Sequence, residues 1–190
     1  MRLSILMILL AASASAQVAT GDSVPLAAEP IASAGGAPLA LADVAGPEGL
    51  VVAFWSDTCP WARRYADRLD ALARDYGPSG IGFVRVYDRR TGANAGRLVT
   101  ADSTAGGAYP VLLDDGRLAE AFGVESSPHV YFFGRDRTLL YDGAIDDSPA
   151  SQDRVRVMYL SAAMDASLAA LPVEIQRTQA FGCIRRQEAE

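Results

Sequence analysis

The sequence predicts an α/β domain in which a central mixed β-sheet carries helices on both faces, in three layers. Apolar runs at 51–55 and 81–87 flank a helical pattern, which is typical of two parallel strands joined by a right-handed crossover. Two later runs, 130–133 and 138–141, are separated by a short polar segment, which predicts an antiparallel hairpin. Parallel and antiparallel strands in one domain indicate a mixed sheet.

Composition favours one folded domain and excludes several classes of function. The chain has 190 residues, of which 50% are hydrophobic, and a net charge of −6, so neither disorder nor a basic surface for nucleic acid is indicated. It contains no lysine, which excludes P-loop and Schiff-base chemistry. One histidine and two cysteines are too few for a four-ligand structural zinc site. We therefore expect no metal, no cofactor and no nucleic-acid partner.

The first residues have the pattern of a secretory signal peptide. Arg2 precedes an apolar stretch at 3–12, and Ala14-Ser15-Ala16 forms a small-x-small cleavage site before Gln17. The apolar stretch is well short of the ~20 residues that span a bilayer. We expect residues 1–16 to be removed after Ala16 and the mature protein to be exported, periplasmic or secreted, without stable membrane insertion.

The remaining chain divides by composition into three parts. Residues 17–48 are rich in Ala, Gly, Pro and Ser with little periodicity, as in a linker or a loosely attached leader. Residues 49–171 carry the strand and helix patterns of the domain. Residues 172–190 form a polar, irregular tail that contains Cys183.

The run at 51–55 is predicted to be a buried strand that delivers a cysteine to a helix. It is β-branched and aromatic without polar alternation, as in a strand covered on both faces. Pro60 suits the first turn of a helix, so Cys59 falls near the N-cap. The helix dipole favours a thiolate there, and Arg63 and Arg64 add positive charge one turn away.

The later elements follow in order along the chain. The first helix has an apolar stripe and ends at Gly77-Pro78; the stripe comprises Trp61, Tyr65, Leu69, Leu72 and Tyr76. A helix is expected around 94–100, a strand at 109–114 and a short helix at 116–122. Ser148-Pro149 is predicted to cap a final helix that runs to Leu171, before Pro172.

The mature chain has two cysteines, so only one intramolecular disulfide is possible, between Cys59 and Cys183. Export to an oxidising compartment would permit it. One interpretation is a structural staple between the tail and the domain. The alternative is a reactive thiol at Cys59, since a Cys-Pro pair at a strand-to-helix junction is a poor place to bury an inert one.

The order of these elements resembles the thioredoxin-fold superfamily, and most closely its redoxin branch of thioredoxin-like and alkyl-hydroperoxide-reductase-like (AhpC/TSA) proteins. The resemblance covers roughly 50–171 and rests on Phe54-Trp55 before Cys59-Pro60 and on Ser127-Pro128 before the hairpin. It implies a three-layer thioredoxin-like fold. In that family the proline equivalent to Pro128 is cis and faces the active cysteine. The resemblance thus implies an active site around Cys59, shaped by Thr58, Pro60, Trp61, Ser127 and Pro128.

A second part of the resemblance concerns the tail. The stretch 127–147 is similar to a subgroup of exported redoxins that often carries a late Gly-Cys followed closely by Ile and a basic residue. Gly182-Cys183-Ile184-Arg185 resembles that ending, with one intervening residue missing.

The sequence also departs from the family. It reads Cys59-Pro60-Trp61-Ala62, so the second cysteine of a Cys-x-x-Cys motif is absent. The Pro-x-x-x-Thr-x-x-Cys signature of peroxidatic peroxiredoxins is absent too, because Thr58 directly precedes Cys59. These departures weigh against a locally closed disulfide and against efficient peroxide reduction.

The leading hypothesis is thiol–disulfide redox chemistry, with Cys59 as the nucleophile and Cys183 as the resolving thiol. Its partners would be a disulfide-bearing protein and an external thiol reductant. Two alternatives remain open: a one-cysteine peroxiredoxin-like peroxidase, and a redox-inactive binding module whose groove at Pro128 holds a peptide, with a structural disulfide. His129 is a candidate for tuning the site, although a lone histidine on a strand is more often a packed residue.

Overall fold

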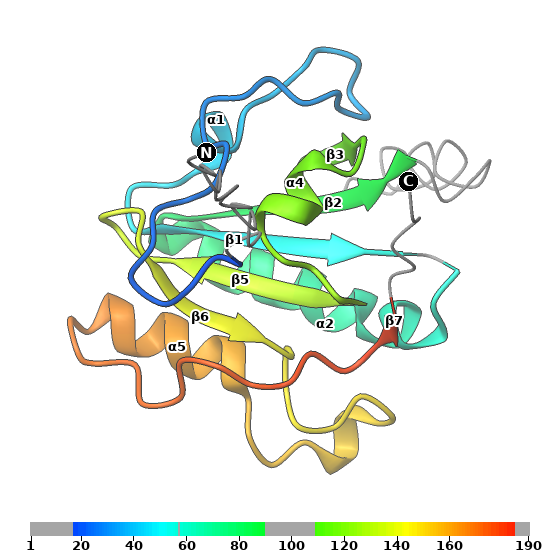
Figure 1. Cartoon of the computed structure of the whole chain (residues 1–190). Helices are drawn as coiled ribbons and strands as arrows, with labels where there is room; N and C mark the ends of the chain where they lie inside the picture. Colours follow the sequence, from blue (N-terminus) through cyan, green and yellow to red (C-terminus); the bar gives the residue numbers. More distant parts are fainter. Residues whose placement is uncertain (1–16, 57, 90–108, 185–190) are drawn as a thin grey trace, which may run out of the picture.

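A five-stranded mixed sheet forms the centre of the molecule (Figure 1). The computed structural model of the chain describes residues 17–56, 58–89 and 109–184. The strand order is β3-β2-β1-β5-β6; β1, β2 and β3 are parallel, whereas β5 is antiparallel to both β1 and β6. The strands are β1 (Gly49–Trp55), β2 (Ile81–Asp88), β3 (Val111–Asp114), β5 (His129–Phe133) and β6 (Leu139–Gly143). The predicted crossover and hairpin are both confirmed.

Helices cover both faces of the sheet, which gives the predicted three layers (Figure 1). On one face lie α2 (Pro60–Tyr76) and α5 (Tyr159–Leu168). On the other lie α1 (Leu41–Val44) and α4 (Arg117–Ala121), together with the segment that precedes the sheet.

Strand β1 contributes to both hydrophobic cores because successive side chains of a strand point to opposite faces. All seven of its residues are buried. Val51 and Ala53 pack in the core beneath α2 and α5, whereas Leu50 and Val52 pack in the core beneath α1 and α4. The continuous apolar run in the sequence is therefore explained by burial on both sides.

Helix α2 begins as predicted, with Cys59 at the N-cap and Pro60 at the first helical position. Its buried face presents Tyr65 and Leu69 to the sheet. The helix ends at Tyr76, and the 3₁₀ turn η1 (Gly77–Ser79) follows directly.

The prediction that the last helix begins at Ser148 is wrong, because α5 begins at Tyr159. The side chain of Ser148 is used within its own turn: its hydroxyl donates to the Ser151 carbonyl, while its backbone N–H donates to Asp146. The short helix η3 (Gln152–Arg154) lies between this turn and α5. Local hydrogen bonding of serine thus outcompetes a helix start at this position.

Residues 17–48 differ from the loosely attached leader that their composition suggests. The segment packs on the sheet through buried apolar side chains, and its backbone bonds to strand β6, where the Gly21 N–H donates to the Leu139 carbonyl and the Leu139 N–H donates to Asp22. The buried residues are Val18, Val24, Ile31, Ala40 and Leu41.

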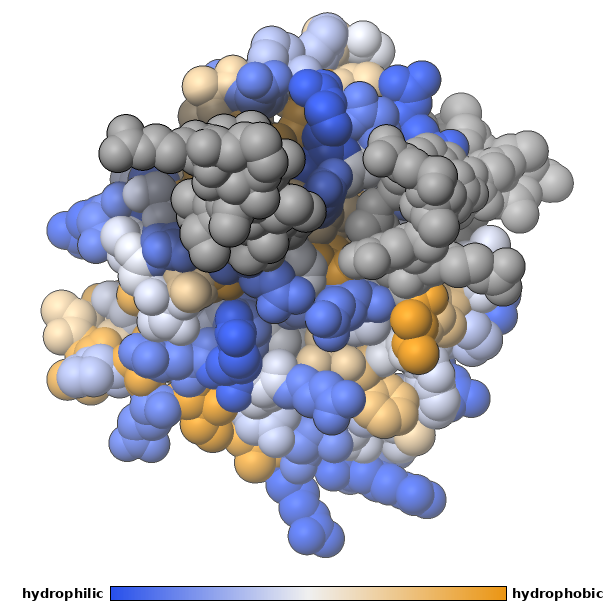
Figure 2. Space-filling view, in the orientation of Figure 1, coloured by the Kyte–Doolittle hydropathy of each residue, from blue (hydrophilic) through white to orange (hydrophobic). Residues whose placement is uncertain are grey.

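The described part of the tail returns across the molecule to the segment before β5. Strand β7 (Cys183–Ile184) pairs antiparallel with β4 (Ser126–Ser127) in a separate two-stranded sheet. The face shown in Figure 2 is mostly hydrophilic, with hydrophobic residues in small separate groups.

Two predictions lie outside the described residues: the signal peptide at 1–16 and the helix at 94–100. Among the helices that the structure does describe, none combines the length and apolar character needed to span a membrane.

Candidate functional site

Cys59 lies at the junction that the sequence predicts, between the end of β1 and the start of α2. Its backbone N–H donates a 3.0 Å hydrogen bond to the Ser56 carbonyl, which closes the turn before the helix. The side chain is only 1% exposed. Neighbouring Thr58 is exposed, and its hydroxyl lies 2.9 Å from that of Ser56.

Cys59 and Cys183 form a disulfide with a Cα–Cα distance of 5.8 Å, within the usual range for such a bond. Cys183 reaches this position because β7 pairs with β4 in a register that sets Cys183 opposite Ser127. Cys183 is half-buried, in contrast to Cys59. Cys59 is thus covered, whereas Cys183 is partly accessible to solvent.

The Ser127–Pro128 peptide lies directly against the disulfide. This peptide bond is cis, and Pro128 is buried. The Ser127 carbonyl oxygen lies 3.2 Å from the Cys59 sulfur. In the disulfide that sulfur carries no hydrogen, so the carbonyl can accept a hydrogen bond from Cys59 only when the thiol is reduced.

Gly182 explains how the tail comes so close to this peptide. A Cβ atom at position 182 would collide with the carbonyl group of Ser127 and approach the nitrogen of Pro128 to 2.8 Å. Only a residue without a side chain allows the two backbones to approach this closely. The glycine before Cys183 is therefore a packing requirement of the site.

An aromatic contact ties the tail to the first turn of α2. The rings of Trp61 and Phe181 meet edge to face, with their centroids 5.0 Å apart. The Arg64 guanidinium lies 5.0 Å from the centroid of the same Trp61 ring. Arg63 and Arg64 are both exposed, so the positive charge expected one turn from Cys59 stands at the surface.

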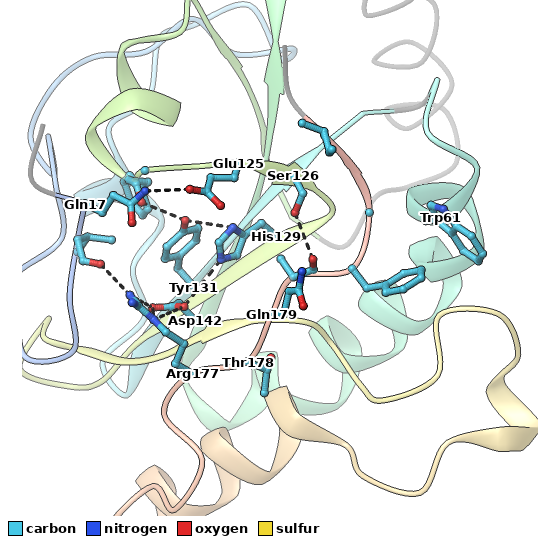
Figure 3. Close-up of a pocket in the computed structure, with 17 residues that line it drawn as sticks. Gln17, Trp61, Glu125, Ser126, His129, Tyr131, Asp142, Arg177, Thr178 and Gln179 are labelled. Atoms are coloured by element: carbon cyan, nitrogen blue, oxygen red, sulfur yellow. Dashed lines mark hydrogen bonds and ion pairs between the residues drawn. The ribbon is translucent and has the colours of Figure 1, made fainter. Parts of the chain in front are cut away.

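A pocket of about 820 Å³ lies between the tail and strands β4 and β5 (Figure 3). Its polar lining includes Gln17, Glu125, Ser126, His129, Tyr131, Asp142, Arg177, Thr178 and Gln179, and its apolar lining includes Trp61, Phe122, Phe181 and Ile184. Neither cysteine lines the pocket, but Gly182, next to Cys183, does.

His129 packs in this pocket and is not directed at the cysteines. Its ring stacks on Tyr131 with centroids 4.3 Å apart, and its Nδ1 lies 3.3 Å from the Tyr131 hydroxyl. Burial raises the pKa of Tyr131, so its hydroxyl keeps its proton and donates to the Phe122 carbonyl. The buried Nε2 has no hydrogen-bond partner among the described residues; the nearest carboxylate, that of Asp142, is 3.9 Å away.

Asp142 holds the base of the tail through Arg177 (Figure 3). Burial by itself would raise the pKa of Asp142, but the neighbouring His129 and Arg177 favour the carboxylate and outweigh it, so the pKa lies below its usual value. The ion pair is therefore formed at neutral pH.

The structure brings Cys59, Cys183 and the Ser127–Pro128 peptide together, but the sequence missed the contacts that fix the tail. Thr58 and Pro60 adjoin Cys59 in the chain, and Trp61 contacts Phe181 of the tail. Arg177, Thr178 and Phe181 lie in a segment without periodicity, and nothing in their identity indicates a contact. Within the described ranges, no group of three or more His, Cys, Asp or Glu side chains could hold a metal ion.

No protein-family model matches the sequence, and no curated protein matches it with significance. Among solved structures, an uncharacterized conserved protein from Geobacillus kaustophilus is similar, with a TM-score of 0.80 and 25% identity over 92% of this chain and 95% of that one. A hypothetical protein from Sinorhizobium meliloti has a TM-score of 0.78 and 27% identity, over 89% and 94% of the two chains.

A third solved structure carries a described activity. It is a secreted disulfide oxidoreductase from Mycobacterium tuberculosis, similar to this chain with a TM-score of 0.55 and 23% identity over 75% of this chain and 95% of that one. Together with the five-stranded mixed sheet and its two helical layers, this likeness shows that the chain has a thioredoxin-like α/β fold.

Proposed function

We propose that the chain is a thiol–disulfide redox protein in which Cys59 is the nucleophile and Cys183 is the resolving thiol. The observation that carries this proposal is the disulfide between a cysteine at the N-cap of α2 and a cysteine on a tail strand that is half-exposed. The N-terminus of α2 stabilises negative charge on Cys59, which makes it the better thiolate of the two.

The oxidation of the protein takes two steps. The Cys59 thiolate attacks one sulfur of a substrate disulfide, that S–S bond breaks, and the released thiolate takes a proton from water. Cys183 then loses its proton and attacks the Cys59 sulfur, which forms the Cys59–Cys183 disulfide and expels the second substrate thiolate, also to be protonated. Counting the proton that Cys59 gives up to become a thiolate, the protein loses two electrons and two protons, and the substrate disulfide becomes two thiols.

The return reaction begins at the other sulfur. Cys59 is 1% exposed in the disulfide, so an external thiolate reaches the half-exposed Cys183 first. Attack there releases Cys59 as the leaving thiolate, which the N-terminus of α2 stabilises. A second thiol of the reductant then frees Cys183, and the reductant carries away the disulfide.

The signal-peptide pattern of the first residues supports the same proposal. The sequence at 1–16 has the pattern of a signal peptide, and one structural neighbour is a secreted disulfide oxidoreductase. Thiols in such a compartment meet disulfides rather than a reducing pool. We assign the chain to that setting, with disulfide-bearing proteins as substrates and a thiol protein as its reductant.

The test is a redox titration of the mature chain combined with trapping. A reversible couple between about −120 and −270 mV is expected for a cycling enzyme. The Cys183→Ser variant should accumulate a mixed disulfide at Cys59 when it is given glutathione disulfide, and the matched Cys59→Ser variant should accumulate much less. If Cys183→Ser instead turns over peroxide with added thiol as well as the wild type does, the one-cysteine peroxidase replaces this proposal.

A second candidate is a redox-inactive binding module with a permanent disulfide. The burial of Cys59, at 1% exposure, favours it, because a covered sulfur reacts slowly. A potential below about −300 mV, with no reduction by thioredoxin under native conditions, would support this candidate and overturn the redox proposal.

A further inference from the structure

The base of the tail is attached to strand β6 by a two-point ion pair. Both Nε and Nη2 of Arg177 donate to the Asp142 carboxylate, at distances of 2.7 to 3.0 Å. The carboxylate is 5% exposed, so the pair is shielded on that side, although the Arg177 side chain is 58% exposed. Nη2 also lies 3.4 Å from the Val18 carbonyl, which links the tail to the N-terminal segment.

Backbone contacts reinforce this attachment on both sides of Arg177. The Asp142 N–H donates to the Gln176 carbonyl, and the Thr178 N–H donates to the Asp142 carbonyl, both at 3.0 Å. The Thr178 hydroxyl accepts a 3.0 Å hydrogen bond from the Ala144 N–H. A side chain on Gly143 would collide with Thr178, so the glycine makes room for the tail. We call this set of contacts, centred on Arg177 and Thr178, the tail anchor.

Beyond the tail anchor, residues 179–182 all line the pocket (Figure 3), and Cys183 follows them directly. Residues 179–182 are exposed or half-exposed, and the Ser126 hydroxyl donates a 3.4 Å hydrogen bond to the Ala180 carbonyl. The tail is thus fixed at its base by the tail anchor and at its far end by the disulfide and the pairing of β7 with β4. Opening the disulfide removes the covalent attachment and leaves the tail anchor.

We propose that Arg177 is a positioning residue for Cys183: through Asp142 it keeps the base of the tail on β6 in the reduced protein, so that Cys183 remains close to Cys59. The inference rests on the proposed redox function and names a residue that affects how readily the Cys59–Cys183 disulfide closes. Cys183 is five positions after Thr178, so the reduced thiol can move at most about 17 Å from the anchor. A short tether keeps its effective concentration at Cys59 high.

The size of the effect follows from the tether length. Without the tail anchor, the next buried side chain upstream is Val173, which lies ten residues before Cys183. Effective concentration falls roughly as the −3/2 power of tether length, so doubling the tether lowers it about threefold. For a two-electron couple, in which tenfold is 29.6 mV, a threefold change makes the potential about 14 mV more positive.

The test compares potentials within one set of variants. The double variant Arg177→Gln/Thr178→Ala keeps the two backbone bonds of the tail anchor, so it should close its disulfide up to about threefold more weakly than the wild type. Arg177→Lys should lose less. Arg135→Gln is the matched control, since Arg135 forms an exposed ion pair with Glu48 at the β5–β6 turn, away from the tail. A double variant whose potential equals that of the wild type, or a control that shifts equally, would overturn the proposal.

A second variant avoids any loss of side chains. Five Gly and Ser residues inserted after Thr178 leave the tail anchor intact and double the tether, so the same threefold weakening is expected; no change would also count against the proposal. The absolute potential of the wild type judges the proposed function, whereas the shift between variants judges the role of Arg177. The role of Arg177 can therefore be contradicted while the proposed redox function is supported, and the reverse is also possible.

Discussion

The two irregular ends of the described chain are attached to the sheet by different means. Residues 17–48 are held by buried apolar side chains and by backbone bonds to β6 and β3. Residues 172–184 bury little apolar surface beyond Val173, while Ile175, Phe181 and Ile184 are exposed. The tail is held instead by an ion pair, a short strand and a disulfide.

The difference indicates which end can move without unfolding the domain. Apolar burial is a permanent attachment, because it responds to no single chemical event. A disulfide is removed by two electrons, after which no covalent bond holds Cys183 to Cys59. The N-terminal segment is therefore part of the core, whereas the end of the tail has one attachment that reduction can remove.

The largest effect is expected for Leu41→Ala, in the N-terminal segment. Leu41 has 0% exposure and lies in the core beneath α1 and α4, so its truncation should lower the free energy of unfolding by about 2 to 5 kcal/mol. Denaturant unfolding should show the same loss in oxidised and reduced protein. Ile175→Ala, at a 45% exposed isoleucine of the tail, should change it by less than about 0.5 kcal/mol. If both truncations lowered the free energy of unfolding equally, the two ends of the described chain would not differ in how they are attached.

Gly182→Ala should have a smaller effect that depends on redox state. The added methyl collides with Ser127, so it should destabilise the oxidised protein by about 1 to 3 kcal/mol and leave the reduced protein nearly unchanged. Gly77→Ala is the control, because a Cβ at that exposed position meets nothing within 4 Å. A loss of the same size in the reduced protein would mean that the tail stays in place after reduction.

The smallest expected effect concerns the charge of Asp142. Because the folded pKa lies below 3.8, charged Asp142 contributes stability that is fully present above the unfolded pKa and is lost as pH falls through the folded one. The difference in unfolding free energy between oxidised wild type and Asp142→Asn should thus be constant from pH 7 to about 5 and shrink below about 4. The exposed variant Asp153→Asn serves as the control. If the difference in unfolding free energy between wild type and Asp142→Asn grew as the pH fell, charged Asp142 would not stabilise the fold, and the assigned ion pair with Arg177 would be contradicted.

The sequence was sufficient to predict the sheet and the helix at Cys59, because these depend on local patterns. The run at 51–55 and the Cys59-Pro60 pair combine hydrophobic continuity with a helix-start signal, and both act within a few residues. The predicted start of α5 is wrong because the Ser148 hydroxyl bonds to the Ser151 carbonyl within its own turn. Asp146 stabilises this turn by accepting a hydrogen bond from the Ser148 backbone N–H.

The attachments of both ends could not be predicted, for a physical reason. Leu41 and Val24 are single apolar residues without a period, so only the finished sheet shows what buries them. The pairing of Arg177 with Asp142 joins residues that are close only after the tail has crossed β6. The Gly182-Cys183 pair is indicated only by the resemblance to exported redoxins. The need for glycine at position 182 comes from its close contact with Ser127, which only the three-dimensional structure shows.

The disulfide also divides the molecule mechanically. It turns the chain between Cys59 and Cys183 into a closed ring that contains β2, β3, β5 and β6, while β1 lies outside. A force that pulls the two ends of the oxidised molecule apart can therefore extract β1 and the segment before it, but it cannot extend the ring. Reduction releases a stretch with a sequence separation of 124, which adds roughly 400 Å of extensible length.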